Sequence, residues 1–257
     1  MLIRVITYNI HRAIGVDRRF RPDRIVRILH HHDPDVVLLQ EVDEGVPRSR
    51  ELDMARELAA ELGFAHFAVG HNVSLRKGRY GNATLSRFPI LRERNIDLSV
   101  PGSWIRRGLS VPGSWIRRGC QHTSIAPLSG RPALEVFNLH LGLSARERDH
   151  QVALLMRSSE FAALGPEAPC LVAGDFNDWR SLLRPVFTNG LGFHCATDSR
   201  AGRHRPLATF PAFSPRGGLD RIYYRGPLRL LGVRRCRLQV ARVASDHRPV
   251  IAEFQYA

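Results

Sequence analysis

Short runs of apolar residues, bounded by polar or turn-forming residues, recur along the whole chain. Such runs predict buried β-strands, because strands are short whereas helices usually need ten or more residues. The predicted strands cover residues 2–10, 36–39, 80–86, 90–97, 119–126, 132–141, 168–173, 219–224, 228–239 and 248–255. Several of these runs end at a polar residue, which places polar side chains at the ends of buried strands.

Three segments between the strands show the spacing of apolar positions that predicts an amphipathic helix. The first begins at Pro22, a residue favoured in a first helical turn, and reaches His32. The second covers residues 51–62. The third begins with a capping box, Ser144 followed by Glu147, and continues to about residue 163. Strands mixed with helices indicate an α/β protein.

The first helix is predicted to end in three histidines, His30-His31-His32. A tract of this kind can suggest a metal site. Neighbouring residues of a helix point in different directions, however, so the three imidazoles cannot all bind one ion. We therefore expect a solvated helix end.

No segment resembles a linker, so we expect one domain over residues 1–257. Residues 178–218 are predicted to be irregular, because they are rich in Pro, Gly and Arg. Residues 98–119 contain a tandem duplication, in which the 11-residue sequence LSVPGSWIRRG occurs twice. Extra loop length costs little entropy. We expect one copy to follow the original loop path and the other to bulge outward.

The run at 168–173 ends in Gly174-Asp175-Phe176-Asn177. In extended backbone, alternate side chains point the same way, so Asp175 and Asn177 are expected to share a pocket while Phe176 packs elsewhere. A carboxylate beside an amide suits a metal or phosphate site. Taken alone, the same residues also describe an ordinary Asp-Asn turn.

Composition narrows the class of protein. A chain of 257 residues with 44% hydrophobic residues is large and apolar enough to bury a core. No apolar run approaches the ~20 residues of a membrane-spanning helix, and the N-terminus lacks the features of a signal peptide. The four cysteines, at 120, 170, 195 and 236, form no CxxC motif. Reduced thiols in a cytoplasmic protein are therefore expected.

Basic residues outnumber acidic residues by 38 to 24, and the formal net charge is +14 at pH 7. Such a charge attracts polyanions and anionic lipid surfaces. Lys77 is the only lysine, however, and a bias this strong toward arginine also arises from genome composition. The charge permits a nucleic-acid or anionic-lipid partner without requiring one.

Polar residues suited to a metal–phosphate site stand at the ends of separate apolar runs. They are Asn9, Glu41, His140, Asp175 with Asn177, Asp220 and the pair Asp246-His247. Carboxylate and amide oxygens favour Mg²⁺ or Mn²⁺ over zinc. Since neighbours in an extended chain diverge, His247 is expected to be oriented by Asp220 rather than by Asp246.

Together these segments carry a family resemblance. They read TYN at 7–9, LQE at 39–41, YGNA at 80–83, NLH at 138–140, GDFN at 174–177, LDRI at 219–222 and SDHRPV at 245–250. Their identity and order resemble the endonuclease/exonuclease/phosphatase superfamily, which includes deoxyribonuclease I. The resemblance implies a four-layered α/β sandwich with two central mixed β-sheets flanked by helices. It also implies divalent-metal-dependent cleavage of phosphate esters.

The resemblance assigns metal and water roles to five residues. Glu41 resembles the principal metal ligand, with Asn9 and Asp246 nearby. Asp175 resembles the residue that activates or positions the attacking water, and Asn177 resembles a phosphate or water positioner. The implied cofactor is Mg²⁺ or Mn²⁺.

Further roles concern the phosphate and the leaving group. His247 resembles the imidazole that meets the scissile phosphate, paired with Asp220. His140 resembles the histidine that protonates the leaving oxygen in the deoxyribonuclease I and sphingomyelinase branches. Asn82 is expected to support the phosphate pocket. Arg118 is the choice for a phosphate contact among the arginines of the duplicated loop, because it adjoins the next strand.

The resulting prediction is a phosphodiesterase that hydrolyses nucleic acid or a phospholipid-type ester by in-line attack of water. Two alternatives stay open. One is a non-catalytic module that binds phosphate or nucleic acid, and the other is a phosphomonoesterase acting on inositol phosphates. A monomer is expected.

Overall fold

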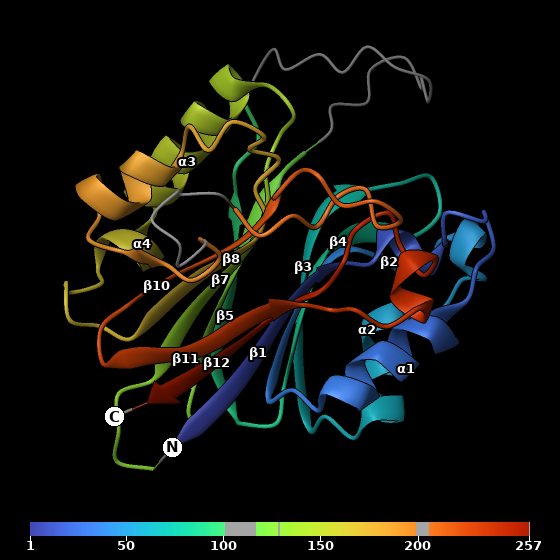
Figure 1. Cartoon of the computed structure of the whole chain (residues 1–257), viewed down its shortest axis with the longest axis horizontal. Helices are drawn as coiled ribbons and strands as arrows, with labels where there is room; N and C mark the ends of the chain where they lie inside the picture. The colour runs from blue at the N-terminus through green and yellow to red at the C-terminus, as the bar shows by residue number, and fades with distance from the viewer. Residues whose placement is uncertain (101–116, 128, 199–205, 257) are drawn as a thin grey trace.

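The computed structural model describes residues 1–100, 117–127, 129–198 and 206–256. Within these residues, two six-stranded β-sheets lie face to face, and helices lie on the two outer sides (Figure 1). This arrangement confirms the predicted four-layered α/β sandwich.

The first sheet has both parallel and antiparallel strands. It contains β1 (Leu2–Asn9), β2 (Val36–Glu44), β3 (His66–Ser74), β4 (Arg79–Ser86), β11 (Leu228–Arg235) and β12 (Val250–Tyr256), in the order β11-β12-β1-β2-β4-β3. β1 runs parallel to β2 and antiparallel to β12. The backbone amide of Tyr256 donates to the carbonyl of Met1 at 2.8 Å, so the two ends of the described chain meet on one side of the molecule (Figure 1).

The second sheet is also mixed. It contains β5 (Ile90–Asp97), β6 (Gly119–Ile125), β7 (Leu134–His140), β8 (Cys170–Asp175), β9 (His194–Cys195) and β10 (Asp220–Arg225), in the order β5-β6-β7-β8-β10-β9. β7 and β8 are parallel, and β10 is antiparallel to β8. Apolar side chains from the facing sides of the two sheets, such as Val5, Leu38, Val136 and Leu171, form the central core.

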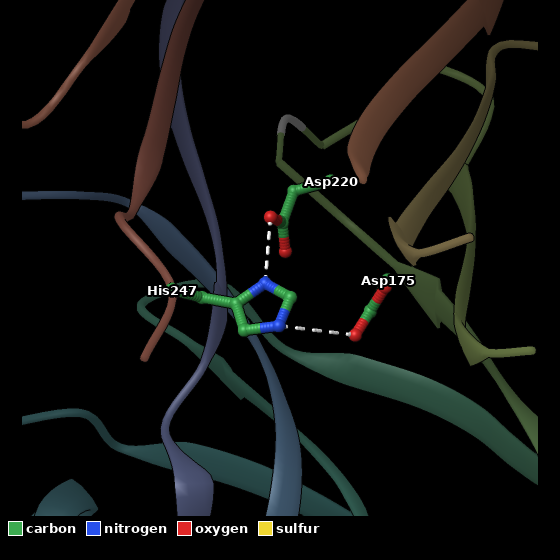
Figure 2. Close-up of side chains that lie close together, drawn as sticks. All are labelled: Asp175, Asp220 and His247. Carbon is green, nitrogen blue, oxygen red and sulfur yellow. Dashed lines mark hydrogen bonds and ion pairs between the residues drawn. The ribbon is translucent and has the colours of Figure 1, made fainter. Parts of the chain in front are cut away.

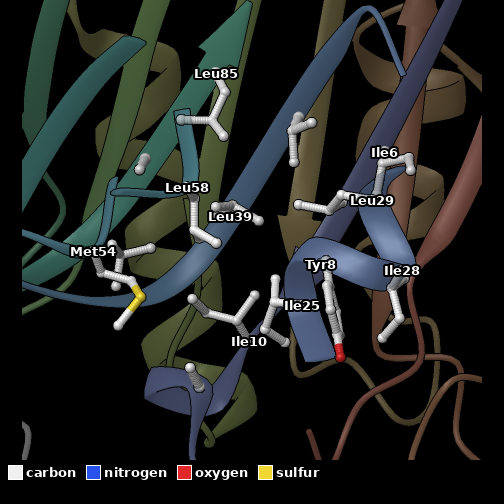
Figure 3. Close-up of a cluster of buried hydrophobic side chains, with 14 of the residues drawn as sticks. Ile6, Tyr8, Ile10, Ile25, Ile28, Leu29, Leu39, Met54, Leu58 and Leu85 are labelled. Carbon is white, nitrogen blue, oxygen red and sulfur yellow. The ribbon is translucent and has the colours of Figure 1, made fainter. Parts of the chain in front are cut away.

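Helices bury the outer faces of the sheets. α1 (Pro22–His32) and α2 (Met54–Leu62) cover the first sheet, and α3 (Ala145–Arg157) and α4 (Ser159–Ala162) cover the second (Figure 1). Figure 3 shows the apolar stripe of α1, including Ile25 and Leu29, against Ile6 and Leu39 of the first sheet. Because each sheet is covered on both sides, its central strands, β1 and β2 in the first sheet and β7 and β8 in the second, are buried along nearly their whole length.

Most predicted elements are confirmed, with four corrections. The third predicted helix is two helices, because Ser158 adopts an extended conformation with ψ of 145° between α3 and α4. The predicted strand at 228–239 ends at Arg235. β3 and the two-residue strand β9, which lies in the segment predicted to be irregular, have no counterpart among the predicted strands. His32 is buried, unlike the exposed His30 and His31, so the expected solvated helix end is wrong for His32.

Most of the duplicated sequence, residues 101–116, lies outside the described residues. The residues that flank it are held together: the amide of Leu98 donates to the carbonyl of Arg118 at 2.9 Å, and Asp97 pairs with Gly119 between β5 and β6. In the described part of the chain, no helix has the length and apolar character needed to cross a membrane.

Candidate active site

The second sheet brings three predicted site residues to one end. β7 and β8 are parallel and in register, so their last residues, His140 and Asp175, are neighbours. β10 runs the other way, so its first residue, Asp220, pairs with Asp175. The three side chains lie at the same end of the sheet because β7 and β8 end there and the antiparallel strand β10 begins there.

The first sheet supplies the opposite half of the site. β1 ends at Asn9, which pairs with Gln40 of β2, and Glu41 follows. β12 is antiparallel to β1, with Thr7 opposite Val250. The residues just before β12, including His247, therefore lie near the end of β1. Segments from both ends of the chain close the site.

The backbone of Gly174-Asp175-Phe176-Asn177 turns sharply. Gly174 has φ of 141°, and a Cβ there would lie 1.9 Å from the carbonyl oxygen of Leu139, so only glycine allows β7 to approach this closely. Phe176 is buried in the outer apolar core, as predicted. Asn177, in contrast to the predicted extended geometry, has φ of 50°. Its side-chain amide donates to Leu141 at 2.9 Å, which fixes its position beside Asp175.

A carboxylate–imidazole–carboxylate arrangement lies at the centre of the site (Figure 2). The Nδ1 atom of His247 lies 2.9 Å from Oδ2 of Asp220, and its Nε2 atom lies 3.6 Å from Oδ2 of Asp175. All three residues are buried. The expectation that Asp220, not Asp246, orients His247 agrees with this geometry.

Burial and charge set the protonation of this group. Burial opposes the charged form of His247, but the charges of Asp220 and Asp175 and the Asp220 hydrogen bond outweigh burial and raise its pKa. Burial, reinforced by the charge of Asp220, raises the pKa of Asp175 above that of an ordinary aspartate. The centre thus combines an imidazolium with a carboxylate of increased basicity.

Asn9 connects this centre to Glu41. Its Nδ2 atom lies 3.0 Å from Oδ2 of Asp175 and 3.4 Å from Oε1 of Glu41, and its Oδ1 atom accepts from the amide of His11 at 3.0 Å. Two carboxylates, one from each sheet, therefore converge on one amide. In this orientation Asn9 positions the carboxylates, and direct metal binding would require its amide to turn over.

Glu41 is displaced from regular strand geometry. It has φ of 59°, and the β2–β4 register shifts between Leu39 and Val42. Such a bulge redirects a side chain at a strand end. Arg12 follows β1 in a turn of left-handed residues, and its Nε atom lies 3.6 Å from Oε2 of Glu41.

His140 and Arg118 border the same centre. The Nε2 atom of His140 lies 3.5 Å from Oδ2 of Asp175. Burial, followed by the charges of Arg118 and His247, lowers the pKa of His140 well below its usual value. This imidazole is therefore neutral. Among the described residues, the buried Nε atom of Arg118 has no hydrogen-bond partner.

The remaining predicted residues occupy different surroundings. Asn82 is buried between the sheets, and its amide donates to the carbonyls of Gly119 and Asn138 at 3.2 and 3.1 Å. Asp246 follows Ser245, whose hydroxyl donates to Oδ1 of Asp246 at 3.3 Å. The structure thus gives Asn82 a role in joining strands, whereas Asp246 stays partly accessible beside His247.

The donor set fits a hard divalent cation. Oxygen atoms of Glu41 and Asp175 surround the Asn9 amide, and Oδ1 of Asp220 is buried without a hydrogen-bond partner in the described part of the chain. Ligand atoms of Asp175, Asp220 and His247 also lie within 4.8 Å of one another. However, both nitrogens of His247 face carboxylates, so the carboxylate oxygens are the better ligands.

Two structural contributors were not predicted. Arg12 carried no distinguishing signal in an arginine-rich sequence. Asn138 stood inside a recognised motif without an assigned role. Its amide group donates to the carbonyls of Leu39 and Ala83, and its oxygen accepts from Gln40 at 2.8 Å. Asn138 thereby ties the two sheets together directly behind the site.

Comparison with known proteins identifies relatives over nearly the whole chain. Residues 6–247 match the model of the Endonuclease/Exonuclease/phosphatase family. The chain is also 32% identical to the Escherichia coli K12 protein YbhP, described as uncharacterized, over 98% of this chain and 95% of that protein.

Solved structures share the fold. The human Nocturnin catalytic domain with bound sulfate is similar with a TM-score of 0.77 and 22% identity, over 100% of this chain and 94% of that one. A mannosyl-6-phosphatase of Bacteroides thetaiotaomicron has a TM-score of 0.73 and 20% identity, over 99% of this chain and 100% of that one. The family match, the fold and the geometry agree: this chain belongs to the endonuclease/exonuclease/phosphatase family.

Proposed function

We propose that this protein is a divalent-metal-dependent phosphodiesterase that hydrolyses its substrate by in-line attack of water. The observation that carries the proposal is the buried Asp175–His247–Asp220 arrangement, linked through Asn9 to Glu41. The imidazolium of His247 can hold a phosphate, and the basic carboxylate of Asp175 beside it can activate water.

The metal in this proposal is Mg²⁺ or Mn²⁺. Glu41 would be its principal ligand, with Asn9 and Asp246 nearby. When bound, the metal neutralises phosphate charge and stabilises the leaving oxygen. The Arg12 pair with Glu41, at 3.6 Å, is loose enough to open when Glu41 takes up another partner.

The protein groups have distinct proposed roles. Asp175 accepts a hydrogen bond from the attacking water and orients it toward phosphorus. His247, held positive by its two carboxylates, donates to a phosphate oxygen. His140, kept neutral by burial, donates a hydrogen bond to the leaving oxygen. Asn177 and Asn82 hold the adjoining backbone, and Arg118 offers its guanidinium to a second phosphate oxygen.

The proposed substrate is a nucleic acid or a phospholipid-type phosphodiester. A phosphomonoesterase is the second candidate, because the similar Bacteroides structure is named a phosphatase. We further propose a single-domain monomer. All four cysteines are free thiols, which supports a reducing, cytoplasmic compartment.

A substrate panel tests the proposal. Plasmid DNA, RNA, an abasic duplex, phospholipids, inositol phosphates and bis-p-nitrophenyl phosphate are each incubated with Mg²⁺, Mn²⁺ or EDTA. We expect at least one diester to be hydrolysed with metal and none with EDTA. Turnover confined to monoesters would favour a phosphatase, and no turnover across the panel would favour a non-catalytic module.

A further inference from the structure

An exposed tryptophan is connected to His247 through a single phenylalanine ring. Trp179 follows the Gly174–Asn177 turn by two residues, and 54% of it is exposed to solvent. Its ring meets Phe210 edge to face, with centroids 5.6 Å apart, and Phe210 in turn lies 5.0 Å from the ring of His247. We call Trp179 and Phe210 the aromatic platform. It extends from the solvent to the proposed phosphate position.

The platform is held rigidly. A Cβ on Gly217 would lie 2.5 Å from the Trp179 ring, so this glycine allows the indole to rest on the backbone of the 210–217 loop. That loop is fixed to the catalytic segment, because Ala212 donates to the carbonyl of Asp246 at 2.7 Å and accepts from Nε of Arg248 at 2.5 Å. The ring is therefore preorganised while much of its surface stays open.

Core packing does not explain this exposure. Tryptophan is normally highly buried, and exposed apolar side chains that lie together beside polar residues mark interaction and ligand-binding sites. Phe213, in the same loop, is 60% exposed. Arg180 follows Trp179 in the sequence, and Arg216 lies in the 210–217 loop. Both side chains are exposed. Open aromatic faces accompanied by arginine suit bases attached to phosphates.

We infer that the aromatic platform binds the nucleobase of a nucleotide-type substrate, with the base stacked on Trp179 and its phosphate at His247. This inference rests on the proposed function, since it names the substrate class of the same site. Stacking on an aromatic ring tolerates any base, so it predicts a preference for nucleotides over other phosphate esters without sequence specificity.

Calorimetric titration in EDTA tests the inference without turnover. The probes are AMP and ribose 5-phosphate, which share the phosphate and differ in the base. We expect AMP to bind about 5- to 150-fold more tightly to the native protein. Trp179→Leu should abolish this preference while leaving ribose 5-phosphate binding unchanged, and Trp179→Phe should retain part of it.

Controls separate stacking from other roles of Trp179. Leu91→Ala removes a comparably exposed side chain, 60% accessible, from β5 and should leave the preference intact. Equal affinities of the native protein for AMP and ribose 5-phosphate would overturn the inference, as would equal weakening of both by Trp179→Leu. Loss of phosphatidylglycerol-vesicle binding in Trp179→Leu without loss of AMP preference would indicate a lipid surface instead.

Failure of the two proposals can be told apart. Base-dependent AMP binding without hydrolysis of any panel substrate would overturn the proposed activity and retain the platform. Hydrolysis without base-dependent binding would overturn the platform and retain the activity.

Discussion

The protonation state of His247 depends on Asp220. Asp220 lies 2.9 Å from Nδ1 of His247, and both are buried, so the pair favours the imidazolium. Asp220→Asn keeps the shape and removes the charge. We expect the pKa of His247 to fall and hydrolysis to drop by about 10²-fold or more. Nuclear magnetic resonance titration of the imidazole in the metal-free variant, together with kcat/KM, measures both effects. An unchanged pKa would contradict this account of His247.

The site residues differ in how well the amino-acid sequence predicts their positions. Asp175 and His247 stand in short motifs that are specific only as part of the ordered set, and their mutual approach agrees with the prediction. The left-handed conformations of Glu41 and Asn177 could not be predicted from the sequence, because positive φ is uncommon for residues other than glycine and depends on the surrounding fold. The same limit applies to Arg12, whose approach to Glu41 depends on an unusual turn at the end of β1.

At the scale of elements, strands with continuous apolar runs were predictable, whereas β3 was not. β3 contains Gly70, two histidines and Asn72, and its exposed and buried positions do not form a continuous apolar run. It lies at the edge of the first sheet, where it forms hydrogen bonds with only one neighbouring strand. Weak burial gives an edge strand a weak sequence signal.

Cross-strand polar contacts support the site from behind, and Asn138 is central to them. Asn138→Leu preserves approximate volume but leaves the Leu39 and Ala83 carbonyls and the Gln40 amide without this partner. We expect the free energy of unfolding to fall by about 3 kcal/mol or more, since each unsatisfied buried group costs about 1–3 kcal/mol. Urea denaturation measures this. Asn95→Leu on the exposed side of β5 is the control, and a similar effect from both variants would refute the role of Asn138.

The end of α1 makes stability depend on pH. Burial, followed by the charge of His31, lowers the pKa of His32 to about 4 in the folded protein. The unfolded chain, with a histidine pKa of about 6.5, takes up a proton first as pH falls. His32 therefore costs stability increasingly from about pH 6.5 down to about pH 4.

Urea denaturation at pH 7.5 and at pH 5 measures this contribution of His32 to stability. His32→Gln should lose less stability on acidification than the native protein, because its side chain does not titrate. His30→Gln, at an exposed position of the same helix end, should behave like the native protein. Equal losses in the native protein and His32→Gln would exclude the contribution of His32.

At the scale of the whole molecule, the order of motifs predicted the fold better than local patterns did. Asn9 donates to Asp175 across 166 residues of sequence, and Ser245 donates to the carbonyl of Asn9 across 236. Hydrophobic periodicity contains no information about such distant pairs. The expectation that these segments meet came from the resemblance of the ordered motifs to a known family.

The duplicated loop is expected to be dispensable for folding. Deleting residues 98–108 leaves an identical copy, in which Leu109 can replace Leu98 next to Arg118. Because halving a loop changes its closure entropy by only about 0.6 kcal/mol, we expect stability to change by less than about 1 kcal/mol. Thermal and urea unfolding measure this change. A much larger loss would show that both copies pack into the fold.

Glu41 and His247 are proposed to support metal-dependent hydrolysis together at one site. The most direct measurement is kcat/KM with Mg²⁺ for the diester best cleaved by the native protein, in Glu41→Gln and His247→Ala. His150→Ala, exposed on α3, is the matched control. We expect losses of about 10²-fold or more in both site variants, none in the control, and no turnover of any of them in EDTA. Native-level hydrolysis by Glu41→Gln and His247→Ala would contradict this proposal.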